Sequence, residues 1–352
     1  MQVKGWSNLG LYLYIIKRLK KFDSERFKKH IDIISKNTGK SKTYIKLDWI
    51  KNLLLYGVGY TDYFRGDYIN LTRKEKKTFV TSKSYYQILK KLNDKEETKK
   101  LSDKLVFNNM FKEFIKRDFI DLREKNANDL QEFVREKQVV FAKIINGYGG
   151  HGVKKITYDK KCDFKKMYKE LSENKQFLIE EAIVQSEVLN EINPYVVNSF
   201  RVVTLYKDGE VHILGNALRV NKGSEDVIGC TDDLYFSLGE DGKINSNVVD
   251  DYGNVFTAHP LTNKTFSEVK IPKVQEAFEM CKQAAMMLPK VRYIGWDVAF
   301  SKNGPCIIEG NEYPGYGIIQ FYKLNGSRTG HKKEIYDVLN SKNGWKVIHF
   351  LL

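Results

Sequence analysis

The chain has 352 residues and a mass of 41.0 kDa, a length that fits two or three domains. Hydrophobic residues make up 42% of it and charged residues 29%, which excludes a disordered chain and is typical of a folded globular protein. The early apolar run from Leu9 to Ile16 ends at Lys17-Arg18. It is too short for a membrane-spanning helix, which needs about 20 apolar residues. No small-residue cleavage pattern of a signal peptide follows it.

The four cysteines lie far apart, at positions 162, 230, 281 and 306. No two of them have C-x-x-C spacing, and no histidine cluster accompanies them, so a structural zinc site and a disulfide framework are both disfavoured. We expect reduced, mostly buried thiols in a cytoplasmic protein.

Nearly all of the net charge of +15 lies in the first part of the chain. Residues 1–100 carry 24 Lys and Arg against 10 Asp and Glu, a net charge of +14. Such asymmetry predicts an anionic partner: nucleic acid, an anionic membrane surface, or an anionic glycan or lipid pyrophosphate. A solvated lysine surface is the alternative. No zinc finger, RNA-recognition signature or KH-type loop occurs here, which disfavours nucleic acid.

The first hundred residues are expected to form a mainly helical, basic domain. Apolar residues recur at helical spacing over 9–35, and 41–57 and 72–92 show helical patterns as well. Thr72 and Glu75 have the spacing of a capping box. The apolar residues up to Ile16, together with the basic residues after them, also fit a helix lying at a membrane surface. An ordinary surface helix is the alternative.

Beyond residue 100 the pattern becomes mixed, which predicts an α+β unit. Helices are expected over 102–118, 164–173 and 272–288, and strands over 139–145, 153–158, 177–183, 199–206, 211–220, 293–300 and 306–309. Asp208-Gly209 is expected to be the turn of the hairpin formed by 199–206 and 211–220.

A glycine-rich loop separates the strands 139–145 and 153–158. It contains Gly147, Gly149, Gly150, His151 and Gly152. Glycines allow backbone N–H groups to fold over a phosphate without interference from a Cβ atom. The spacing matches neither the P-loop nor the dinucleotide-binding fingerprint, so a plain flexible turn is the alternative.

Two carboxylates lie in apolar strands near the C-terminus. Asp297 and Glu309 have apolar neighbours on both sides, and Asn311 shares a strand face with Glu309. A carboxylate in such a setting must be paired or must bind a metal, and oxygen ligands without His or Cys suit magnesium. A buried salt bridge is the alternative to this metal site.

One metal site requires Asp297 and Glu309 to share a face of the hairpin. A two-residue turn at Asn303-Gly304 would pair residue 302 with 305 and place the carboxylates on opposite faces. A shared site therefore predicts a loop with an odd number of residues centred on Asn303, or a β-bulge.

Three cations also lie in apolar strands: Lys143, Arg201 and Arg219. Buried cations need anionic partners, which a nucleoside triphosphate beside a magnesium site would supply. Isolated salt bridges are the alternative.

These residues, in this order over about 100–330, resemble the ATP-grasp superfamily. The resemblance implies that Lys104 and Lys143 contact ATP phosphates and that the loop with Gly149, Gly150 and Gly152 covers them. It implies that the backbone of a hinge binds adenine and that an acidic residue binds ribose. It also implies that two arginines lie near the γ-phosphate and that a triad binds two Mg²⁺ ions. The residues implied are Glu180, Glu181, Ala182 and Ile183 for the hinge, Glu187 or Glu191 for ribose, Arg201 and Arg219, and the triad Asp297, Glu309 and Asn311.

A narrower resemblance is to the sugar-transfer-associated ATP-grasp proteins of surface polysaccharide assembly. The segments that carry it are 194–204, 295–299, Asp62-Tyr63-Phe64 and Lys77-Thr78-Phe79. It implies an ATP-grasp fold with two α+β subdomains clasping ATP. The expected divisions are a helical domain at 1–100, a central subdomain at 101–184 and a C-terminal subdomain at 185–352. After the hinge the chain has Gln185-Ser186, where a Gln-His pair is expected.

The activity implied is that of a carboxylate–amine ligase working through an acyl phosphate, on a uronic acid or amino acid and an amine of a capsule-like polysaccharide precursor. Magnesium and the basic residues would neutralise the moving phosphoryl group, with Arg201, Arg219 and Lys104 as the catalytic cations. A kinase and a non-catalytic ATP-binding module are the alternatives. The expected location is cytoplasmic, at the inner face of the membrane if the basic region binds there.

Overall fold

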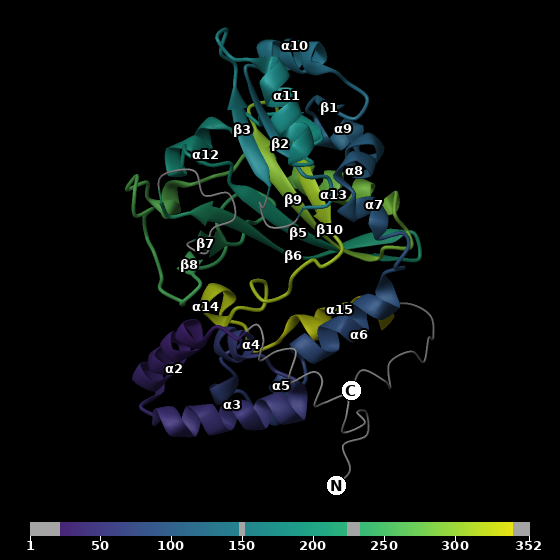
Figure 1. The fold of residues 1–352 in the computed structure, drawn as a ribbon. Helices are drawn as coiled ribbons and strands as arrows, with labels where there is room; N and C mark the ends of the chain where they lie inside the picture. Colours follow the sequence, from purple (N-terminus) through teal and green to yellow (C-terminus); the bar gives the residue numbers. More distant parts are fainter. Residues whose placement is uncertain (1–21, 148–151, 224–232, 341–352) are drawn as a thin grey trace.

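Two antiparallel β-sheets and a separate group of helices make up the computed structural model, which describes residues 22–147, 152–223 and 233–340 (Figure 1). Gly149, Gly150 and Cys230 therefore lie outside the described residues, as do residues 9–21 of the first expected helix.

The smaller sheet has four strands in the order β1-β4-β2-β3. Its strands are β1 Phe119–Asp121, β2 Val139–Lys143, β3 Val153–Thr157 and β4 Leu178–Glu181. The helices α10 (Ala127–Lys137) and α11 (Phe164–Glu173) pack on it around a core that includes Leu130, Val140 and Leu171. Strands β2 and β3 are the ones that precede and follow the glycine-rich segment in the sequence.

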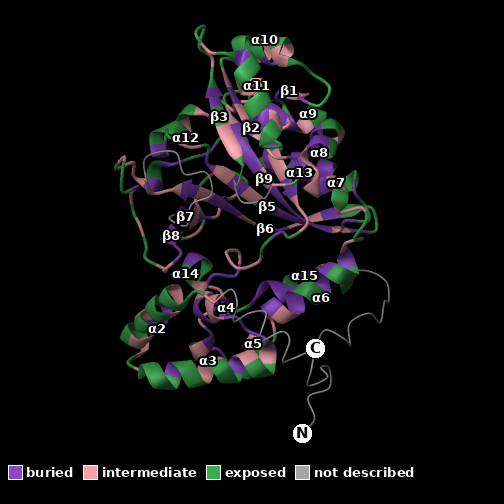
Figure 2. Cartoon of the chain, in the orientation of Figure 1, coloured by how far each residue is buried: buried purple, intermediate pink, exposed green. Residues whose placement is uncertain are grey.

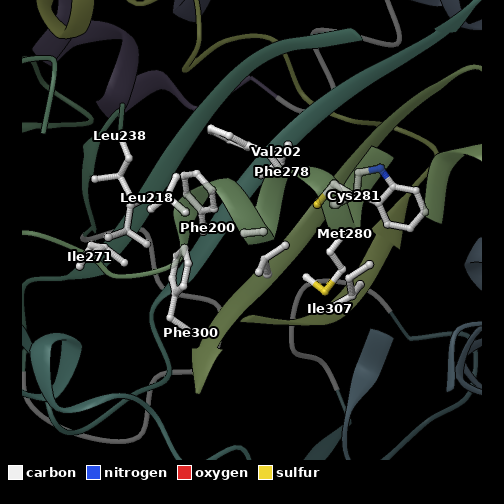
Figure 3. Packing of buried hydrophobic residues seen from close by; sticks show 14 of the residues in the cluster. Phe200, Val202, Leu218, Leu238, Ile271, Phe278, Met280, Cys281, Phe300 and Ile307 are labelled. Carbon is white, nitrogen blue, oxygen red and sulfur yellow. The ribbon is translucent and has the colours of Figure 1, made fainter. Parts of the chain in front are cut away.

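The larger sheet has six strands in the order β10-β9-β5-β6-β7-β8. Its strands are β5 Ser199–Lys207, β6 Glu210–Asn221, β7 Asp233–Phe236, β8 Val249–Asp250, β9 Tyr293–Ser301 and β10 Gly304–Asn311. One face packs against α13 (Val274–Met286), and Phe200, Phe278 and Phe300 lie in that core (Figure 3). Side chains alternate along a strand, so this burial directs Arg201 and Arg219 to the opposite face.

The N-terminal helices pack against the C-terminal part of the chain (Figure 1). They are α2 Ser24–Thr38, α3 Lys42–Tyr56, α4 Tyr60–Arg65, the 3₁₀ turn Tyr68–Asn70, α5 Arg73–Lys76 and α6 Ser82–Leu92. Their core contains Ile31, Tyr63 and Phe64, and it extends to Val249 of β8 and to Phe321 just before α14 (Tyr322–Asn325). The outer faces of α2 and α3 are largely exposed (Figure 2).

A buried carboxylate links these helices to the segment that follows β10. Asp62 Oδ2 accepts hydrogen bonds from the Gly59 amide at 3.1 Å, from the Ser82 hydroxyl at 2.8 Å and from the Tyr316 hydroxyl at 3.2 Å. Burial of a charge is tolerated only with such partners. The Asp62-Tyr63-Phe64 sequence thus acts in packing.

Short elements complete the fold. They are α7 Lys99–Ser102, α8 Lys104–Met110, α9 Lys112–Ile115, α12 Glu187–Ile192, the 3₁₀ turn Phe266–Glu268 and α15 His331–Asn340. Helix α6 packs with α15 on the larger sheet, through Ile88, Leu205 and Ile335.

Several expected elements are confirmed. The capping box is present, because the Glu75 amide donates to Thr72 Oγ1 at 3.3 Å and the Thr72 amide to Glu75 Oε2 at 2.6 Å. The β5–β6 turn lies at Asp208-Gly209, where both φ angles are positive, at 49° and 88°. This is the backbone of a tight hairpin turn.

Three helix predictions are wrong in their extent. The expected helix 9–35 has no helical residue at 22–23, because Asp23 is the N-cap of α2 and accepts from the Arg26 amide. The expected helix 72–92 is divided because Thr81 starts α6 as a second N-cap. The expected helix 102–118 is divided into α8 and α9, and strand β1 follows unpredicted. In the first two cases, a local side-chain cap interrupted a pattern that hydrophobic periodicity alone made continuous.

None of the helices in the described ranges combines the length and the apolar character needed to cross a lipid bilayer. Among the described cysteines, Cys281 and Cys306 are buried and Cys162 is partly exposed.

Candidate active site

A β-bulge brings the two strand carboxylates to one face of the β9–β10 hairpin. Gly304 pairs with Ser301, so Lys302 and Asn303 form a two-residue turn. The register then shifts between Ile307 and Glu309, and Glu309 pairs directly with Asp297. The predicted bulge is therefore confirmed, while the turn lies one residue earlier than Asn303-Gly304. Without the bulge, the turn would place the carboxylates on opposite faces.

An arginine that the sequence did not single out binds the backbone at this bulge. Arg117 Nη1 donates to the Ile307 carbonyl at 2.7 Å, and its Nη2 donates to the Ile308 carbonyl at 3.0 Å. The same guanidinium donates to Glu180 Oε1 from Nε at 3.2 Å and from Nη2 at 2.9 Å. Arg117 thereby joins the smaller sheet to the bulge.

Glu180 is the centre of a buried charge cluster. Its side chain is 3% exposed, and its Oε1 also accepts a hydrogen bond from Asn108 Nδ2 at 2.6 Å, while its Oε2 pairs with Lys143 Nζ. Burial alone would raise the pKa of this carboxyl, but Arg117 and Lys143 outweigh burial and hold the pKa well below its usual range. Sequence patterns gave no sign of Asn108 or Arg117, which fall in a stretch expected to be an amphipathic helix.

Two lysines and Glu309 line one cavity of about 50 Å³. Lys104 donates to the Gly147 carbonyl. Burial lowers the pKa of Lys104, and Glu309 opposes that shift. Burial and the charge of Asp297 raise the pKa of Glu309, against the opposing effects of Lys104 and Lys143. The cavity lining also includes Lys143, Glu180, Gly147 and Asn311. The structure thus brings together lysines and carboxylates that lie far apart in the sequence.

The expected triad forms a compact group that includes Arg201. The Asn311 amide donates to Asp297 Oδ2 at 3.2 Å and to Glu309 Oε1 at 3.3 Å. Arg201 donates from Nε to Asp297 Oδ1 at 2.6 Å and from Nη2 to Oδ2 at 2.9 Å. The Arg201 guanidinium thus supplies the positive charge beside Asp297. No cluster of three or more His, Cys, Asp or Glu side chains suited to a metal occurs among the described residues.

Two carboxylates with one amide nevertheless fit Mg²⁺. That ion is typically held by one or two carboxylates together with substrate phosphates, and not by a cage of protein ligands. The lysines of the adjoining cavity would face those phosphates.

Arg219 lies one row further along the same sheet face. Its cross-strand partners are Ser199 of β5 and Tyr235 of β7, and its Nε donates to Asp233 Oδ2. Asn221 Nδ2 donates to the other oxygen of Asp233 at 3.1 Å. The sequence had not indicated Asp233 as its partner.

The expected hinge covers the last two residues of β4 and the two residues after it, and the amides of Glu181 and Ala182 are already bonded. The Glu181 amide donates to the Asp118 carbonyl at 2.9 Å, and the Ala182 amide donates to the Val139 carbonyl at 3.0 Å. The Ile183 amide has no acceptor within the described part of the chain. It is the hinge N–H group left to bind a ligand.

The two candidate ribose-binding acids differ in their surroundings. Glu187 is exposed in the first turn of α12, whereas Glu191 forms an ion pair with Lys264 at 2.8 Å. Glu187 is therefore the better placed of the two to bind a ligand.

Gly152 is required where the glycine-rich segment enters β3. Its φ is +72°, and a Cβ atom there would lie 2.3 Å from Ile144 Cδ1. A side chain at this position would have a strained backbone and would displace the side chain of Ile144, the residue after Lys143.

A model of the sugar-transfer associated ATP-grasp family matches residues 81–333. The chain belongs to this family. The expected ATP-grasp fold is thereby confirmed, with a mainly helical region before it. No curated protein sequence matches the chain significantly.

Solved structures with a similar chain path are ligases and carboxylases. D-alanyl-alanine synthetase A from Vibrio cholerae is 15% identical, with a TM-score of 0.40 over 69% of this chain and 65% of that one. An L-amino acid ligase from Bacillus licheniformis is 12% identical, with a TM-score of 0.42 over 69% of this chain and 49% of that one. A biotin carboxylase from Campylobacter jejuni is 13% identical, with a TM-score of 0.46 over 71% and 48%. The chain thus spans less than two thirds of the length of each.

The Glu180 cluster predicts a pH-dependent stability. A pKa lowered by folding gives stability that is complete above the ordinary value of about 4.3 and is lost as the pH falls toward the folded value. We expect Glu180→Gln to lower the free energy of unfolding at pH 7 by about 3 kcal/mol, since it leaves Arg117 and Lys143 uncompensated. The free energy of unfolding of the Glu180→Gln variant should also fall less between pH 5 and pH 4 than that of the natural protein. Urea unfolding measured across this range tests both effects.

Glu181→Gln is the matched control for this measurement. Glu181 is the next residue, its side chain is 37% exposed and it lies 3.9 Å from Lys137, so its loss should cost about 0.5 kcal/mol or less. Equal effects of the two substitutions would contradict the central role of Glu180.

Proposed function

We propose that the protein is an ATP-dependent carboxylate–amine ligase that forms an amide through an acyl phosphate on a precursor of a cell-surface polysaccharide. The observation that carries this proposal is the shared cavity, in which Lys104 and Lys143 face Glu309 while Asp297 pairs with Glu309 across the bulge. Cations for phosphate and carboxylates for a divalent ion thus meet at one point. The family's association with sugar transfer supports the polysaccharide precursor.

ATP would lie between the two sheets. Lys104 and Lys143 would bind its phosphates, the Ile183 amide would bind the adenine ring, and Glu187 would bind the ribose. Gly147, whose carbonyl accepts a hydrogen bond from Lys104, begins the glycine-rich segment that connects β2 to β3 in the sequence. In this proposal that segment closes over the phosphates and keeps water from the acyl phosphate.

Asp297, Glu309 and Asn311 would hold Mg²⁺. The ion supplies positive charge that neutralises the triphosphate and the moving phosphoryl group. Arg201 must then leave at least part of its contact with Asp297. Once released, its guanidinium is free to bind the γ-phosphate, with Arg219 one row further along the sheet.

The reaction requires two successive displacements. A substrate carboxylate oxygen attacks the γ-phosphorus, the bond to the β-phosphate oxygen breaks, and ADP leaves. An amine then attacks the acyl carbon, loses a proton to solvent and expels inorganic phosphate. The carboxylate would be a uronic acid or an amino acid. The residues of the site orient the reactants and balance charge, and no side chain is assigned as a general base.

Trapping with hydroxylamine tests the reaction class. An acyl phosphate reacts with hydroxylamine to give a hydroxamate, whereas a phosphorylated alcohol does not. With the right carboxylate, ATP and magnesium, hydroxamate and ADP should form in equal amounts. Glu309→Gln should slow both by about a hundredfold, because loss of one such charge from the transition state costs about 3 kcal/mol. The exposed Glu170 serves as the control, since Glu170→Gln should leave both rates unchanged.

Three outcomes would overturn this assignment. AMP and pyrophosphate as products would indicate a different ATP chemistry. ADP formed with a stable phosphoester in place of the hydroxamate would identify the kinase alternative. Full activity of Glu309→Gln would remove the metal role of that carboxylate.

The contact between Arg201 and Asp297 predicts competition between the arginine and the metal. Arg201→Gln removes a guanidinium that contacts both oxygens of Asp297, at 2.6 and 2.9 Å. We therefore expect Mg²⁺ or Mn²⁺ to bind the ADP complex about tenfold more tightly, a difference of about 1.4 kcal/mol. Calorimetry with Mg²⁺ or electron paramagnetic resonance of Mn²⁺ measures this affinity.

Arg219→Gln is the control for that experiment. It removes a neighbouring cation that pairs with Asp233 and not with Asp297. Its metal affinity should stay within about twofold of the natural protein. Weaker metal binding by the Arg201 variant would show that the arginine supports the metal site and does not compete for it.

The same proposal places the protein in the cytoplasm, at the inner face of the membrane where such precursors are assembled. Helix α3 exposes large apolar side chains next to exposed lysines. The apolar residues are Tyr44, Leu47, Ile50, Leu54 and Leu55, which are 43–62% exposed, and the lysines are Lys42, Lys46 and Lys51. An apolar face flanked by cations is typical of a helix lying on an anionic bilayer.

Vesicle binding tests this location. Leu47→Glu combined with Leu54→Glu should abolish binding to vesicles that contain phosphatidylserine, and salt should weaken the natural protein's binding because the Debye length is about 10 Å at 0.1 M. Val255→Glu with Leu261→Glu, at apolar positions that are 57% and 41% exposed elsewhere, is the control. Equal binding to uncharged vesicles would contradict the role of the basic region.

A further inference from the structure

One face of the six-stranded sheet is polar from the candidate metal residues to the N-terminal helices. Cross-strand pairing places Glu309, Asp297 and Arg201 in one row and Ser199, Arg219 and Tyr235 in the next. Arg201 and Arg219 keep 30% and 41% of their side-chain surface exposed. A substrate beside the metal residues can therefore extend along this face.

Arg65, the last residue of α4, lies where the polar face of the sheet meets the N-terminal helices. Tyr235 packs against the core of the N-terminal helices, and both acidic and basic side chains affect the pKa of its phenol. Burial and the carboxylates of Asp251 and Asp233 raise the pKa of Tyr235 to about 12, while Arg65 and Arg219 oppose the shift. Arg219 of β6 is the direct cross-strand neighbour of Tyr235, and Arg65 at the end of α4 contributes to the electrostatic environment of the same phenol.

The segment after β10 brings Arg65 and Arg201 to neighbouring positions. A Cβ atom added to Gly315 would lie 3.8 Å from Arg201 Nη1, and one added to Gly317 would lie 2.7 Å from Arg65 Nη1. Arg201 Nη1 also donates to the Pro314 carbonyl at 2.7 Å, so the two guanidinium groups lie along the same short segment. Gly317 allows Arg65 an approach to the backbone that a side chain would block.

Arg65 is only partly neutralised. Its Nη2 lies 2.5 Å from Asp251 Oδ1, and Arg26 Nη2 lies 3.0 Å from the same oxygen, so two guanidinium groups share one carboxylate oxygen. Arg65 Nη1 has no hydrogen-bond acceptor among the described residues. The side chain is 15% exposed and is held over the Phe321 ring at 5.8 Å. A fixed guanidinium with a spare edge is suited to binding an oxyanion.

We propose that Arg65 binds a second anionic group of the carboxylate substrate, a phosphate or a further carboxylate, at the end of the polar face away from the metal residues. This inference rests on the proposed function, since that function places the reacting carboxylate beside Arg201. It makes the substrate class a compound with two anionic groups. It also gives the N-terminal helices a part in substrate selection.

Inorganic phosphate is the probe for this site. The full chain is first saturated with Mg²⁺ and β,γ-imido-ATP, which fills the γ-phosphate position, and phosphate or acetate is then titrated and followed by ³¹P or ¹³C resonance. One further saturable anion site is expected in the natural protein. Arg65→Gln should weaken it about tenfold or more, the loss of a charge-assisted hydrogen bond. Preference for phosphate or for acetate identifies the group.

Two variants separate anion binding from structural support. Arg26→Gln removes the other guanidinium from Asp251 Oδ1 and should change the anion affinity less than twofold, whereas Gly317→Ala keeps every charge, displaces Arg65 Nη1 and should weaken binding severalfold. Equal losses in the Arg26 and Arg65 variants, or no saturable site in the nucleotide-loaded protein, would overturn the inference. Failure of the nucleotide itself to bind would instead overturn the proposed function, and this inference with it.

Discussion

The buried carboxylate of Glu180 is the constraint on which the candidate site depends. It fixes Arg117, which also donates to the carbonyls of Ile307 and Ile308 at the β10 bulge. That bulge brings Glu309 opposite Asp297. On its other oxygen Glu180 holds Lys143 at the end of β2. One side chain therefore couples the position of Lys143, the proposed phosphate ligand, to the position of Glu309, the proposed metal ligand, although the two lie on different sheets.

Most charges of the site are paired with an opposite charge of the protein. Asp297 is paired with Arg201, Asp233 with Arg219 and Glu180 with Lys143 and Arg117. Buried charges without such partners would carry a large desolvation penalty. Each of these charges is thus kept in place by an opposite charge. In the proposed function, the metal would replace Arg201 at Asp297, and the triphosphate would replace Glu180 at Lys143.

Much of the fold followed from local patterns in the sequence. The β5–β6 hairpin, helix α11 and the β9–β10 hairpin were predicted, because strand alternation and helical periodicity reflect which face is buried. The breaks at Asp23 and Thr81 were missed, since a single side-chain cap can end a pattern that remains apolar on both sides. Short elements such as β1 and β8 could not be predicted, because a strand of two or three residues is specified mainly by the strand beside it.

The sequence by itself determined which residue types could form a site: a glycine-rich connection, lysines and arginines in apolar strands, and an Asp, Glu and Asn set on one hairpin. It also required a bulge or an odd loop, since the two-residue period of a strand allows no other way for Asp297 and Glu309 to share a face. Only the tertiary structure decided which partner each charge has. Arg117, Asn108 and Asp233 reach the site from segments whose local patterns carry no functional signal, because ion pairs between distant segments depend on how the sheets and helices pack. The meeting of Arg65 with the end of the polar face is likewise a product of that packing.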